Sequence, residues 1–422
     1  MRIADLVRFG LSLTLLSLSA AHPEHVVAGE PREWVVHFEG SPPPGVRTNP
    51  ALLRLGLGVW NAPEAHLAAS AADSRILDYW PNTRVSIQIE PDDPYWPHQY
   101  GPRNIQLPQV WDVLTGGACL TVTVAVIDTG VDLVHSDLVG RFWRNAGETD
   151  AGRETNGVDD DGNGFVDDWQ GWDFANDDND PQDDHGHGTH VAGIVAATAN
   201  NGLGVAGAAS LGCPAQIMAL KVLKANGEGT DADVAAAVRY AAEQGARVIN
   251  LSLGARKETP ATGMAIEDAT AQGALVIAAA GNSGQFGVYY PAAYENAVAV
   301  AAGDSANRRA YFSSYGPQVD LTAPGVAIYS TLRHNYYGTL SGTSMATPHV
   351  AAAAALLASQ PQFNTPAKIR AALEYTALDL GSVCRDPYFG AGLVQTLEAL
   401  SYDPQVEHPV KCFYYFFPLV GR

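Results

Sequence analysis

Five short apolar segments alternate with alanine-rich helical segments along most of this chain, and this alternation limits the folds it can adopt. The predicted strands are Val122–Ile127, Ile217–Val222, Val248–Leu251, Ala274–Ala279 and Ala297–Ala301. Each strand is apolar on both faces, which is typical of a parallel sheet that helices cover on two sides. We therefore predict an α/β fold, doubly wound, with a mostly parallel sheet and helices on both faces.

Two helical segments between these strands have clear start and stop signals. A helix is predicted at Asp231–Gln244, because Thr230 precedes it as a cap, apolar residues recur at helical spacing and Gly245 ends it. A second helix is predicted at Met264–Gln272, which Gly273 ends in the same way. In such folds functional groups lie at the carboxyl ends of strands, so polar residues at these ends are the candidates for a site.

The chain has 422 residues and a strongly negative charge, since 25 Lys and Arg against 45 Asp and Glu leave a net charge of −20. This charge argues against binding to nucleic acid or to an anionic membrane surface. One Glu and eleven Asp lie between Glu154 and Asp184, without a Lys or Arg among them. Because carboxylates at this density repel one another, the stretch is a candidate site for a bound cation.

Residues 1–21 resemble a secretory signal peptide. They combine basic residues, a short apolar run and small residues at a cleavage site, namely Arg2, Arg8, Phe9–Leu18, Ser19 and Ala21. The alternative is a buried N-terminal helix. The apolar run is too short to span a bilayer, and no later run reaches about 18 apolar residues. We expect an exported protein without a membrane span, either secreted or held in the periplasm or at the cell surface.

Export makes two disulfides the expected state of the four cysteines. They are Cys119, Cys213, Cys384 and Cys412. Cys119 and Cys213 each precede a predicted core strand by a few residues, whereas Cys384 and Cys412 are both C-terminal. Of the three possible arrangements we favour Cys119–Cys213 with Cys384–Cys412. No Cys-x-x-Cys motif is present, which argues against a zinc knuckle and a thioredoxin-type redox site.

Residues 22–95 differ from the rest of the chain. They contain Pro and Gly turns at Ser41–Gly45 and strand-like runs at Trp34–Phe38 and Arg84–Ile89. An aromatic run at Phe413–Val420 is expected to form a packed strand or a tail. We divide the chain into a signal segment, an N-terminal domain, a main domain and a tail, at residues 1–21, 22–95, 96–402 and 403–422.

Three polar clusters at strand and helix ends supply a carboxylate, an imidazole and a hydroxyl. Asp128 lies in Val-Ile-Asp-Thr-Gly, His187 in His-Gly-Thr-His and Ser344 in Gly-Thr-Ser-Met-Ala-Thr-Pro-His. Taken singly, each has a structural alternative, such as a turn-capping Asp or a Ser that caps a helix. Together they fit a nucleophilic triad, in which a base takes the hydroxyl proton and a carboxylate orients the base. The chain order Asp, His, Ser is one of the known orders.

A fourth polar cluster, Ala-Ala-Gly-Asn-Ser-Gly, places Asn282 after the predicted strand Ala274–Ala279. Its side-chain amide is able to donate an N–H to the oxyanion that develops when a carbonyl is attacked. Asn282 is therefore the candidate oxyanion-hole donor.

These motifs resemble those of the subtilisin-type serine endopeptidases, the subtilase family, from about Tyr95 to Leu400. The resemblance implies a triad of Asp128, His187 and Ser344. It also implies an oxyanion hole formed by the Asn282 side chain and the Ser344 backbone amide, in a serine-type endopeptidase.

The same resemblance implies that two segments flank the cleft and pair with an extended peptide substrate by strand addition. The cleft segments and pocket walls are Gly227, Gly229, Ser252, Leu253, Gly254, Ala279, Ala280 and Gly281. Tyr289 is expected at the floor of the pocket for P1, the substrate residue on the N-terminal side of the scissile bond. We therefore expect small or medium side chains at P1.

By this resemblance residues 22–95 correspond to an inhibitory propeptide, a small α+β domain that assists folding and is removed by self-cleavage. The cut is expected between Glu90 and Pro102, which makes the chain a zymogen with its own propeptide as an inhibitor. The alternative is an ordinary N-terminal domain. The other expected partners are protein or peptide substrates, and we expect a monomer.

Within the acidic stretch, one nine-residue segment follows the EF-hand ligand pattern, with oxygen ligands at positions 1, 3, 5 and 9 and Gly at position 6. The predicted ligands of a structural calcium ion are Asp159, Asp161, Asn163, Phe165 and Asp167. Position 12 is Gln170 instead of Glu, and Asp168 is the substitute. The alternative is a solvated acidic loop.

Other functions fit the residues less well. The spacing of His185, His187 and His190 is similar to that of metallo-β-lactamase-type zinc clusters, but Thr189 stands where that pattern has Asp. A pepsin-like protease needs a second Asp-Thr/Ser-Gly copy, which is absent. A sedolisin-like peptidase needs an acid as its base and an Asp in place of Asn282. An inactive subtilase that only binds peptides or calcium is the remaining alternative.

Overall fold

The structure is a computed structural model that describes residues 32–62, 73–82, 90–149, 152–406 and 408. The chain forms two compact units, residues 1–85 and 86–422. The signal segment and the runs expected at Arg84–Ile89 and Phe413–Val420 lie outside the described residues. Within the described part of the chain, no helix is long and apolar enough to cross a membrane.

In its described residues, the first unit contains a small antiparallel sheet and one short helix, α1. Its strand order is β2-β3-β1-β4. The bounds are β1 Arg32–Phe38, β2 Val46–Arg47, α1 Pro50–Arg54, β3 Leu57–Ala62 and β4 Ile76–Pro81. Trp34 and Val36 of β1 are buried and pack with Trp60 of β3. The unit is therefore a small α+β fold with a core of its own.

The second unit is built on a seven-stranded parallel sheet with the order β11-β10-β9-β8-β5-β7-β6. The bounds are β5 Thr123–Asp128, β6 Gly171–Asp173, β7 Gln216–Lys221, β8 Val248–Leu251, β9 Leu275–Ala279, β10 Ala297–Gly303 and β11 Leu321–Pro324. All five predicted strands are present, shifted by no more than two residues at either end.

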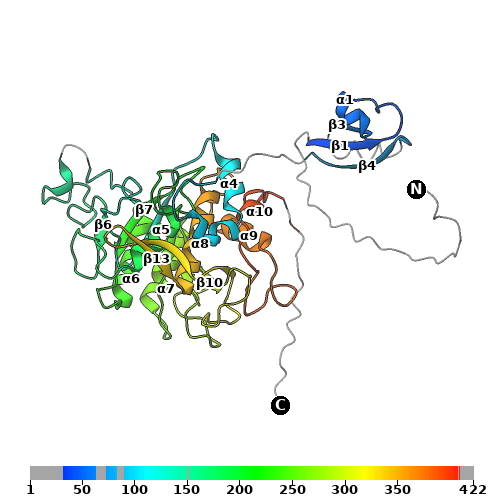
Figure 1. The fold of residues 1–422 in the computed structure, drawn as a ribbon. Helices are drawn as coiled ribbons and strands as arrows, with labels where there is room; N and C mark the ends of the chain where they lie inside the picture. The colour runs from blue at the N-terminus through cyan, green and yellow to red at the C-terminus, as the bar shows by residue number, and fades with distance from the viewer. Residues whose placement is uncertain (1–31, 63–72, 83–89, 150–151, 407, 409–422) are drawn as a thin grey trace, which may run out of the picture. The chain divides into compact units, whose positions relative to one another are not determined.

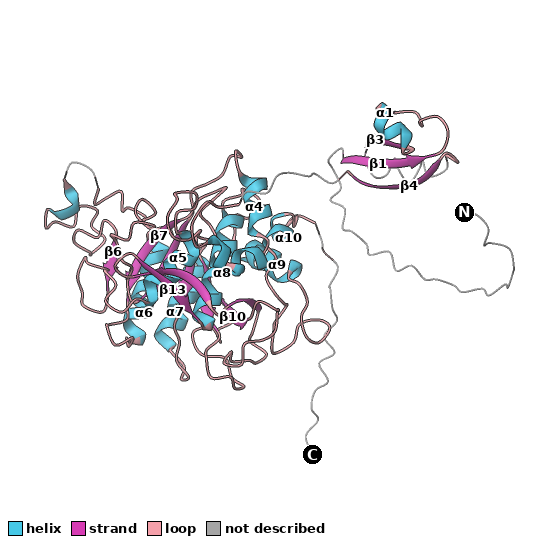
Figure 2. Ribbon diagram, viewed as in Figure 1, coloured by secondary structure: helices cyan, strands magenta, loops and turns pink. Residues whose placement is uncertain are grey.

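Helices cover both faces of this sheet (Figure 1; Figure 2). Four of these helices are α5 His187–Ala196, α8 Thr343–Ala358, α6 Asp231–Glu243 and α7 Pro260–Ala271. Val124 and Val126 of β5 pack in the core cluster that contains α5 and α8, whereas Ala125 and Ile127 pack in the cluster that contains α6 and α7. This alternation explains why the strands are apolar on both faces. The predicted doubly wound α/β class is confirmed.

The remaining described elements complete the second unit. Their bounds are η1 Trp96–His98, α3 Tyr100–Asn104, α4 Leu107–Leu114, η2 Arg153–Thr155, the hairpin strands β12 Ile328–Leu332 and β13 Tyr336–Leu340, α9 Pro366–Thr376 and α10 Thr396–Leu400. Asp93 accepts a hydrogen bond from the Asn200 backbone N–H (2.9 Å), and Trp96 is buried in the main core. Residues 93–96 therefore belong structurally to the second unit.

A disulfide joins Cys119 and Cys213, one of the two pairs expected from the sequence. These cysteines precede β5 and β7, which are neighbouring strands of the sheet. Cys412, the expected partner of Cys384, lies outside the described residues.

Candidate active site

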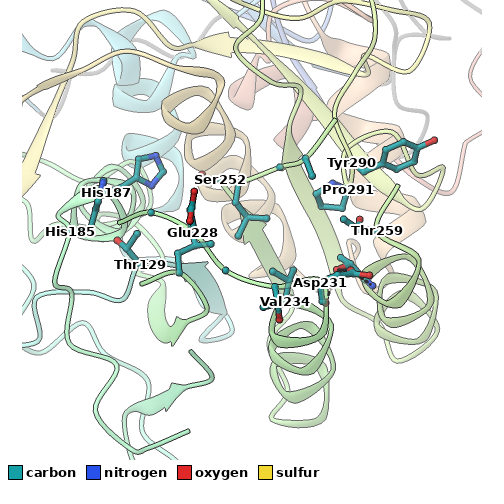
Figure 3. Close-up of a pocket in the computed structure, with 18 residues that line it drawn as sticks. Thr129, His185, His187, Glu228, Asp231, Val234, Ser252, Thr259, Tyr290 and Pro291 are labelled. Carbon is teal, nitrogen blue, oxygen red and sulfur yellow. Dashed lines mark hydrogen bonds between the residues drawn. The ribbon is translucent and has the colours of Figure 1, made fainter. Parts of the chain in front are cut away.

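A cleft of about 640 Å³ opens at the carboxyl ends of the central strands (Figure 3). Gly227 and Gly229, which follow β7, line one side, and Ser252, Leu253 and Gly254, which follow β8, line the other. His187 also lines the cleft. The two segments that were expected to pair with a substrate therefore face the same hollow.

Asp128 and His187 form a hydrogen-bonded pair beside this cleft. Asp128 is the last residue of β5 and is fully buried, and His187 is the first residue of α5. The Nδ1 atom of His187 lies 2.7 Å from Oδ1 of Asp128. A carboxylate acceptor at this distance favours the tautomer that carries a proton on Nδ1, which leaves Nε2 free to act as a base.

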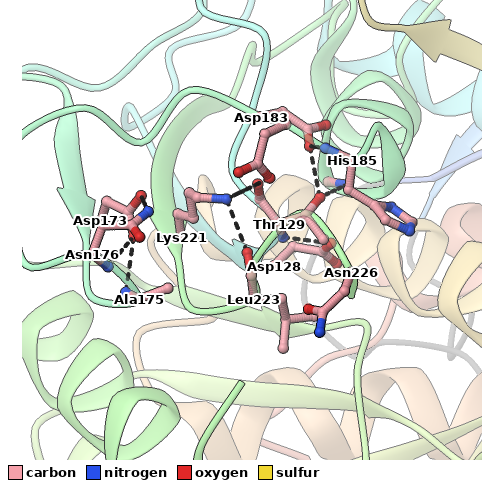
Figure 4. A network of polar contacts seen from close by, with 12 residues as sticks. Asp128, Thr129, Asp173, Ala175, Asn176, Asp183, His185, Lys221, Leu223 and Asn226 are labelled. Carbon is pink, nitrogen blue, oxygen red and sulfur yellow. Dashed lines mark hydrogen bonds and ion pairs between the residues drawn. The ribbon is translucent and has the colours of Figure 1, made fainter. Parts of the chain in front are cut away.

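A second buried carboxylate, Asp183, holds the start of α5 in place (Figure 4). Its oxygens accept hydrogen bonds from the backbone N–H groups of His185 (2.9 Å), Gly186 (2.8 Å) and Thr189 (3.0 Å), and from the hydroxyls of Thr129 (2.9 Å) and Thr189 (2.5 Å). These donors surround the residue that begins the helix, so Asp183 orients the backbone that carries the His187 ring.

The environment raises the pKa of His187 above its ordinary value. Burial lowers this pKa, but the charge and hydrogen bond of Asp128, together with the charge of Asp183, outweigh the effect of burial. The protonated imidazole is therefore stabilised, which helps a base that must hold a proton during a reaction.

Ser344 is the second residue of α8, a helix that contains Pro348. Because Pro348 has no N–H, the Ser344 carbonyl lacks its usual helical donor. The Ser252 hydroxyl donates to this carbonyl at 2.8 Å and so ties the start of α8 to the wall of the cleft. Among the described residues, no hydrogen bond joins the Ser344 hydroxyl to His187, and such bonds often tighten only when substrate is bound.

Asn282, which follows β9, has a fixed orientation. Its Oδ1 atom accepts hydrogen bonds from the Thr343 backbone N–H (2.8 Å) and from the Thr343 hydroxyl (3.0 Å). Because a backbone N–H can only donate, the atom that faces it is the amide oxygen. The Nδ2 group therefore points the other way, and Asn282 and Ser344 both line a smaller pocket of about 170 Å³.

This smaller pocket is bordered by Leu253, Gly254, Ala279, Gly281 and Tyr289. A side chain at Gly281 would place its Cβ 2.6 Å from the Tyr289 ring, so the ring lies directly against that glycine. The Tyr289 hydroxyl accepts a hydrogen bond from Arg256 (2.8 Å), which restrains the ring further. Ala280, which was expected in the wall, is fully buried in the core and does not line the pocket.

The acidic loop, residues 148–168, brings three carboxylates together. Oxygen atoms of Glu148, Asp159 and Asp161 lie within 4.8 Å of one another. Glu148 is fully buried, and its Oε2 atom has no hydrogen-bond partner. Burial raises the pKa of Glu148, and the nearby charges of Asp168 and Asp161 raise it further. A buried carboxylate with an unpaired oxygen among other acids is the arrangement that a hard cation stabilises.

Glu148 was absent from the sequence prediction because it precedes the recognised pattern by eleven residues. Of the predicted ligands, Asn163 donates to Asp161 (3.2 Å), whereas Asp167 accepts from the Gly157 backbone N–H (3.0 Å) and is not in the three-carboxylate cluster. The Phe165 ring packs against Trp172.

The sequence and fold of this chain are similar to those of known proteases. A model of the subtilase family matches residues 121–392. Thermitase of Thermoactinomyces vulgaris is 43% identical over 313 residues, which cover 74% of this chain and 99% of thermitase. A thermophilic serine proteinase of a Bacillus species is 42% identical over 323 residues, covering 76% of this chain and 72% of that protein. A solved structure of a protease from Pseudoalteromonas arctica matches with a TM-score of 0.60 and 30% identity, over 74% of this chain and 99% of that one.

Proposed function

Because this chain belongs to the subtilase family and is a serine-type endopeptidase, we propose that Asp128, His187 and Ser344 form its catalytic triad. The observation that carries this assignment is the pairing of buried Asp128 with His187 at 2.7 Å, at the edge of a cleft whose wall is bonded to Ser344. No other described Asp, His and Ser come together in this way beside the cleft.

In the proposed reaction, His187 Nε2 takes the proton of the Ser344 hydroxyl as the oxygen attacks the carbonyl carbon of the scissile bond. His187 then gives this proton to the leaving amine, and an acyl-enzyme remains on Ser344. Water, deprotonated by the same His187, attacks the acyl group, and His187 returns this proton to the Ser344 oxygen as the second product leaves. Asp128 keeps the imidazole in the required tautomer and stabilises its charged form throughout.

The developing oxyanion is stabilised by two donors. A Cβ built on Gly342 would lie 3.5 Å from Asn282 Nδ2 and 3.6 Å from the Ser344 backbone nitrogen, so both nitrogens border the same small space. Donors that are fixed before the reaction stabilise negative charge without further reorganisation. The bonds from Thr343 to the Asn282 oxygen supply this fixed orientation.

Fluorophosphonate labelling tests the nucleophile, because the reagent reacts with activated serines. We expect labelling of the wild-type protein, none in Ser344→Ala, and wild-type labelling in Ser341→Ala, a control three residues away on the exposed surface. A zinc hydrolase would not be labelled. Equal labelling of wild type and Ser344→Ala would contradict the assignment.

The 170 Å³ pocket beside Ser344 is proposed to hold the P1 side chain. Tyr289 occupies the space against Gly281, so the pocket suits small or medium side chains. The neighbouring segments Gly227–Gly229 and Ser252–Gly254 are proposed to bind the substrate backbone as an added strand.

A structural calcium ion is proposed in the acidic loop. Glu148, Asp159 and Asp161 would hold it, since their oxygens converge and one of them is buried without a partner. Calcium prefers carboxylate and carbonyl oxygens, and extracellular fluids contain it at millimolar concentration. When bound, the ion neutralises the repulsion within the loop.

We further propose export by the segment 1–21 and synthesis as a zymogen. The first unit is a separately packed α+β domain, which suits a removable propeptide. Cleavage is proposed between Glu90 and Pro102, and a cut at the Glu90 end of this range would leave residues 93–96 within the second unit. The pairing of Cys384 with Cys412, a C-terminal tail at 403–422 and a monomeric enzyme are also part of this proposal.

A further inference from the structure

The catalytic cleft carries two carboxylates that the reaction does not use. Among the described residues that line it, Glu228 and Asp231 are the acidic ones, and no Lys or Arg is present. The lining also includes the imidazoles of His185 and His187. The walls therefore present negative charge to whatever occupies the cleft.

Glu228 lies between Gly227 and Gly229, in the segment that faces the substrate backbone. Its side chain is exposed, and Oε2 accepts one hydrogen bond, from Asn226 at 3.0 Å. A carboxylate offers about four acceptor positions, so Glu228 retains the capacity to bind a further donor. Figure 3 shows Glu228 on the side of the cleft where His187 lies.

Asp231 is the first residue of α6 and lies toward the other end of the cleft (Figure 3). Its carboxylate accepts from the backbone N–H groups of Ala261 (3.1 Å) and Thr262 (3.0 Å) and from the Thr262 hydroxyl (2.6 Å). These bonds hold the Asp231 carboxylate in a fixed position. The carboxylate therefore does not need to reorient when a cationic ligand binds.

The arrangement of the two hollows determines which substrate residues meet these charges. Leu253 and Gly254 line both the 170 Å³ pocket and the 640 Å³ cleft, so this segment separates them. Side chains of an extended peptide point alternately to opposite faces. P2 and P4 are the second and fourth substrate residues on the N-terminal side of the scissile bond. If P1 enters the smaller pocket, P2 and P4 face the cleft, and the rise of two strand residues places them about 7 Å apart.

We propose that Glu228 and Asp231 make this protease select substrates with Lys or Arg at P2 and P4, with Glu228 binding the P2 side chain and Asp231 the P4 side chain. This inference rests on the proposed function. The bound peptide covers both carboxylates and lowers the local dielectric constant. The interaction energy between a carboxylate and a cationic side chain, which is small in open solvent, therefore increases and separates substrates more strongly.

Tetrapeptide substrates with a constant small P1 residue test the proposal. P2 and P4 are varied separately among Lys, norleucine, which has a similar length without charge, and Glu. In the wild-type enzyme we expect kcat/KM for Lys to exceed that for norleucine by roughly threefold to tenfold at each position, and Glu to be the poorest. Adding 1 M NaCl should reduce this ratio, because salt screens exposed charges.

Each variant serves as the control for the other. Glu228→Gln should lose the preference for Lys at P2 and keep it at P4, whereas Asp231→Asn should do the reverse. Because the ratio compares substrates within one variant, a change in overall activity does not affect it. If Asp231→Asn folds poorly, Asp231→Ser removes the charge and keeps an oxygen that caps α7.

Equal rates for Lys and norleucine in a wild-type enzyme that cleaves both would overturn this inference and leave the proposed function intact. A Lys preference that survives removal of the facing carboxylate would overturn it as well. If the wild-type protein cleaves none of the peptides and is not labelled by fluorophosphonate, the proposed function itself fails.

Discussion

The charges around His187 show how single residues adjust the proposed base. Asp128 bonds the ring directly, whereas Asp183 acts through charge and through the backbone that begins α5. Asn282 is likewise oriented by its neighbour, Thr343. His187 and Asn282 thus each depend on a partner that takes no part in the bond changes.

Asp183→Asn should shift the pH profile of activity. Only neutral His187 acts as a base, so kcat/KM rises as pH increases through its pKa. The negative charge of Asp183 raises that pKa, and its removal should move the acidic limb of the profile to lower pH. The control is Asp184→Asn, because the Asp184 carboxylate pairs instead with Lys221 (2.7 Å). An unmoved limb in Asp183→Asn would contradict this.

Asn282→Ala should lower kcat far more than it changes KM, because the amide meets the oxyanion only as the transition state forms. Removal of such a side-chain donor in a subtilisin lowers kcat by about 10² to 10³, and we expect a loss of the same order. Steady-state kinetics on one peptide substrate measure it. A variant with unchanged kcat would show that Asn282 is not the donor.

Tyr289→Ala should broaden the proposed P1 pocket toward Phe and Leu. The wild-type enzyme should cleave best after small or medium side chains, since the Tyr289 ring fills the space against Gly281. A peptide panel that varies only P1 measures both preferences. Efficient wild-type cleavage after Phe would count against the role of Tyr289.

At the level of structural elements, the segment between β5 and α5 contains two groups of carboxylates on either side of β6. One part gathers Glu148, Asp159 and Asp161, and the other ends in Asp183 and His187. The EF-hand pattern located the first part from sequence, but Glu148 belongs to no local pattern. The folding of the loop alone brings it to the other two carboxylates.

Removal of calcium should lower the thermal stability of the protein. We expect EDTA to lower Tm by roughly 5 °C, with recovery on adding CaCl2 but not ZnCl2, because the converging ligands are oxygens. Glu148→Gln should weaken this response. Asp160→Asn is the matched control, since Asp160 is in the same loop but outside the cluster. A Tm that does not respond to EDTA in the wild type would argue against a bound ion.

Across the whole molecule, the division into two compact units bears on maturation. The first unit has a core of its own, and residues 93–96 pack with the second. The disulfide Cys119–Cys213 joins the segments that precede two neighbouring strands of the second unit. Cutting the chain near Glu90 would therefore break none of the contacts described for either core.

Ser344→Ala should accumulate as a precursor that retains the first unit, because the proposed cut is made by the enzyme itself. The wild-type protein should mature to a form whose N-terminus lies between Glu90 and Pro102. Mass spectrometry of the purified chains measures both. A fully active wild-type protein that still contains residues 32–82 would show that the first unit is not a propeptide.

Much of this protein is encoded locally in its sequence. The alternation of wholly apolar strands with helical segments predicted the parallel sheet, because a strand that is buried on both faces must be apolar throughout. Short motifs around Asp128, His187, Asn282 and Ser344 predicted a serine endopeptidase site, because the glycines and helix starts that surround these residues are adjacent in the sequence. Only the tertiary structure decided three further features: the bonds of Asp183 to the start of α5, the approach of Glu148 to Asp159 and Asp161, and the burial of Ala280 away from the pocket. These outcomes depend on how loops fold and segments pack, which local patterns do not record.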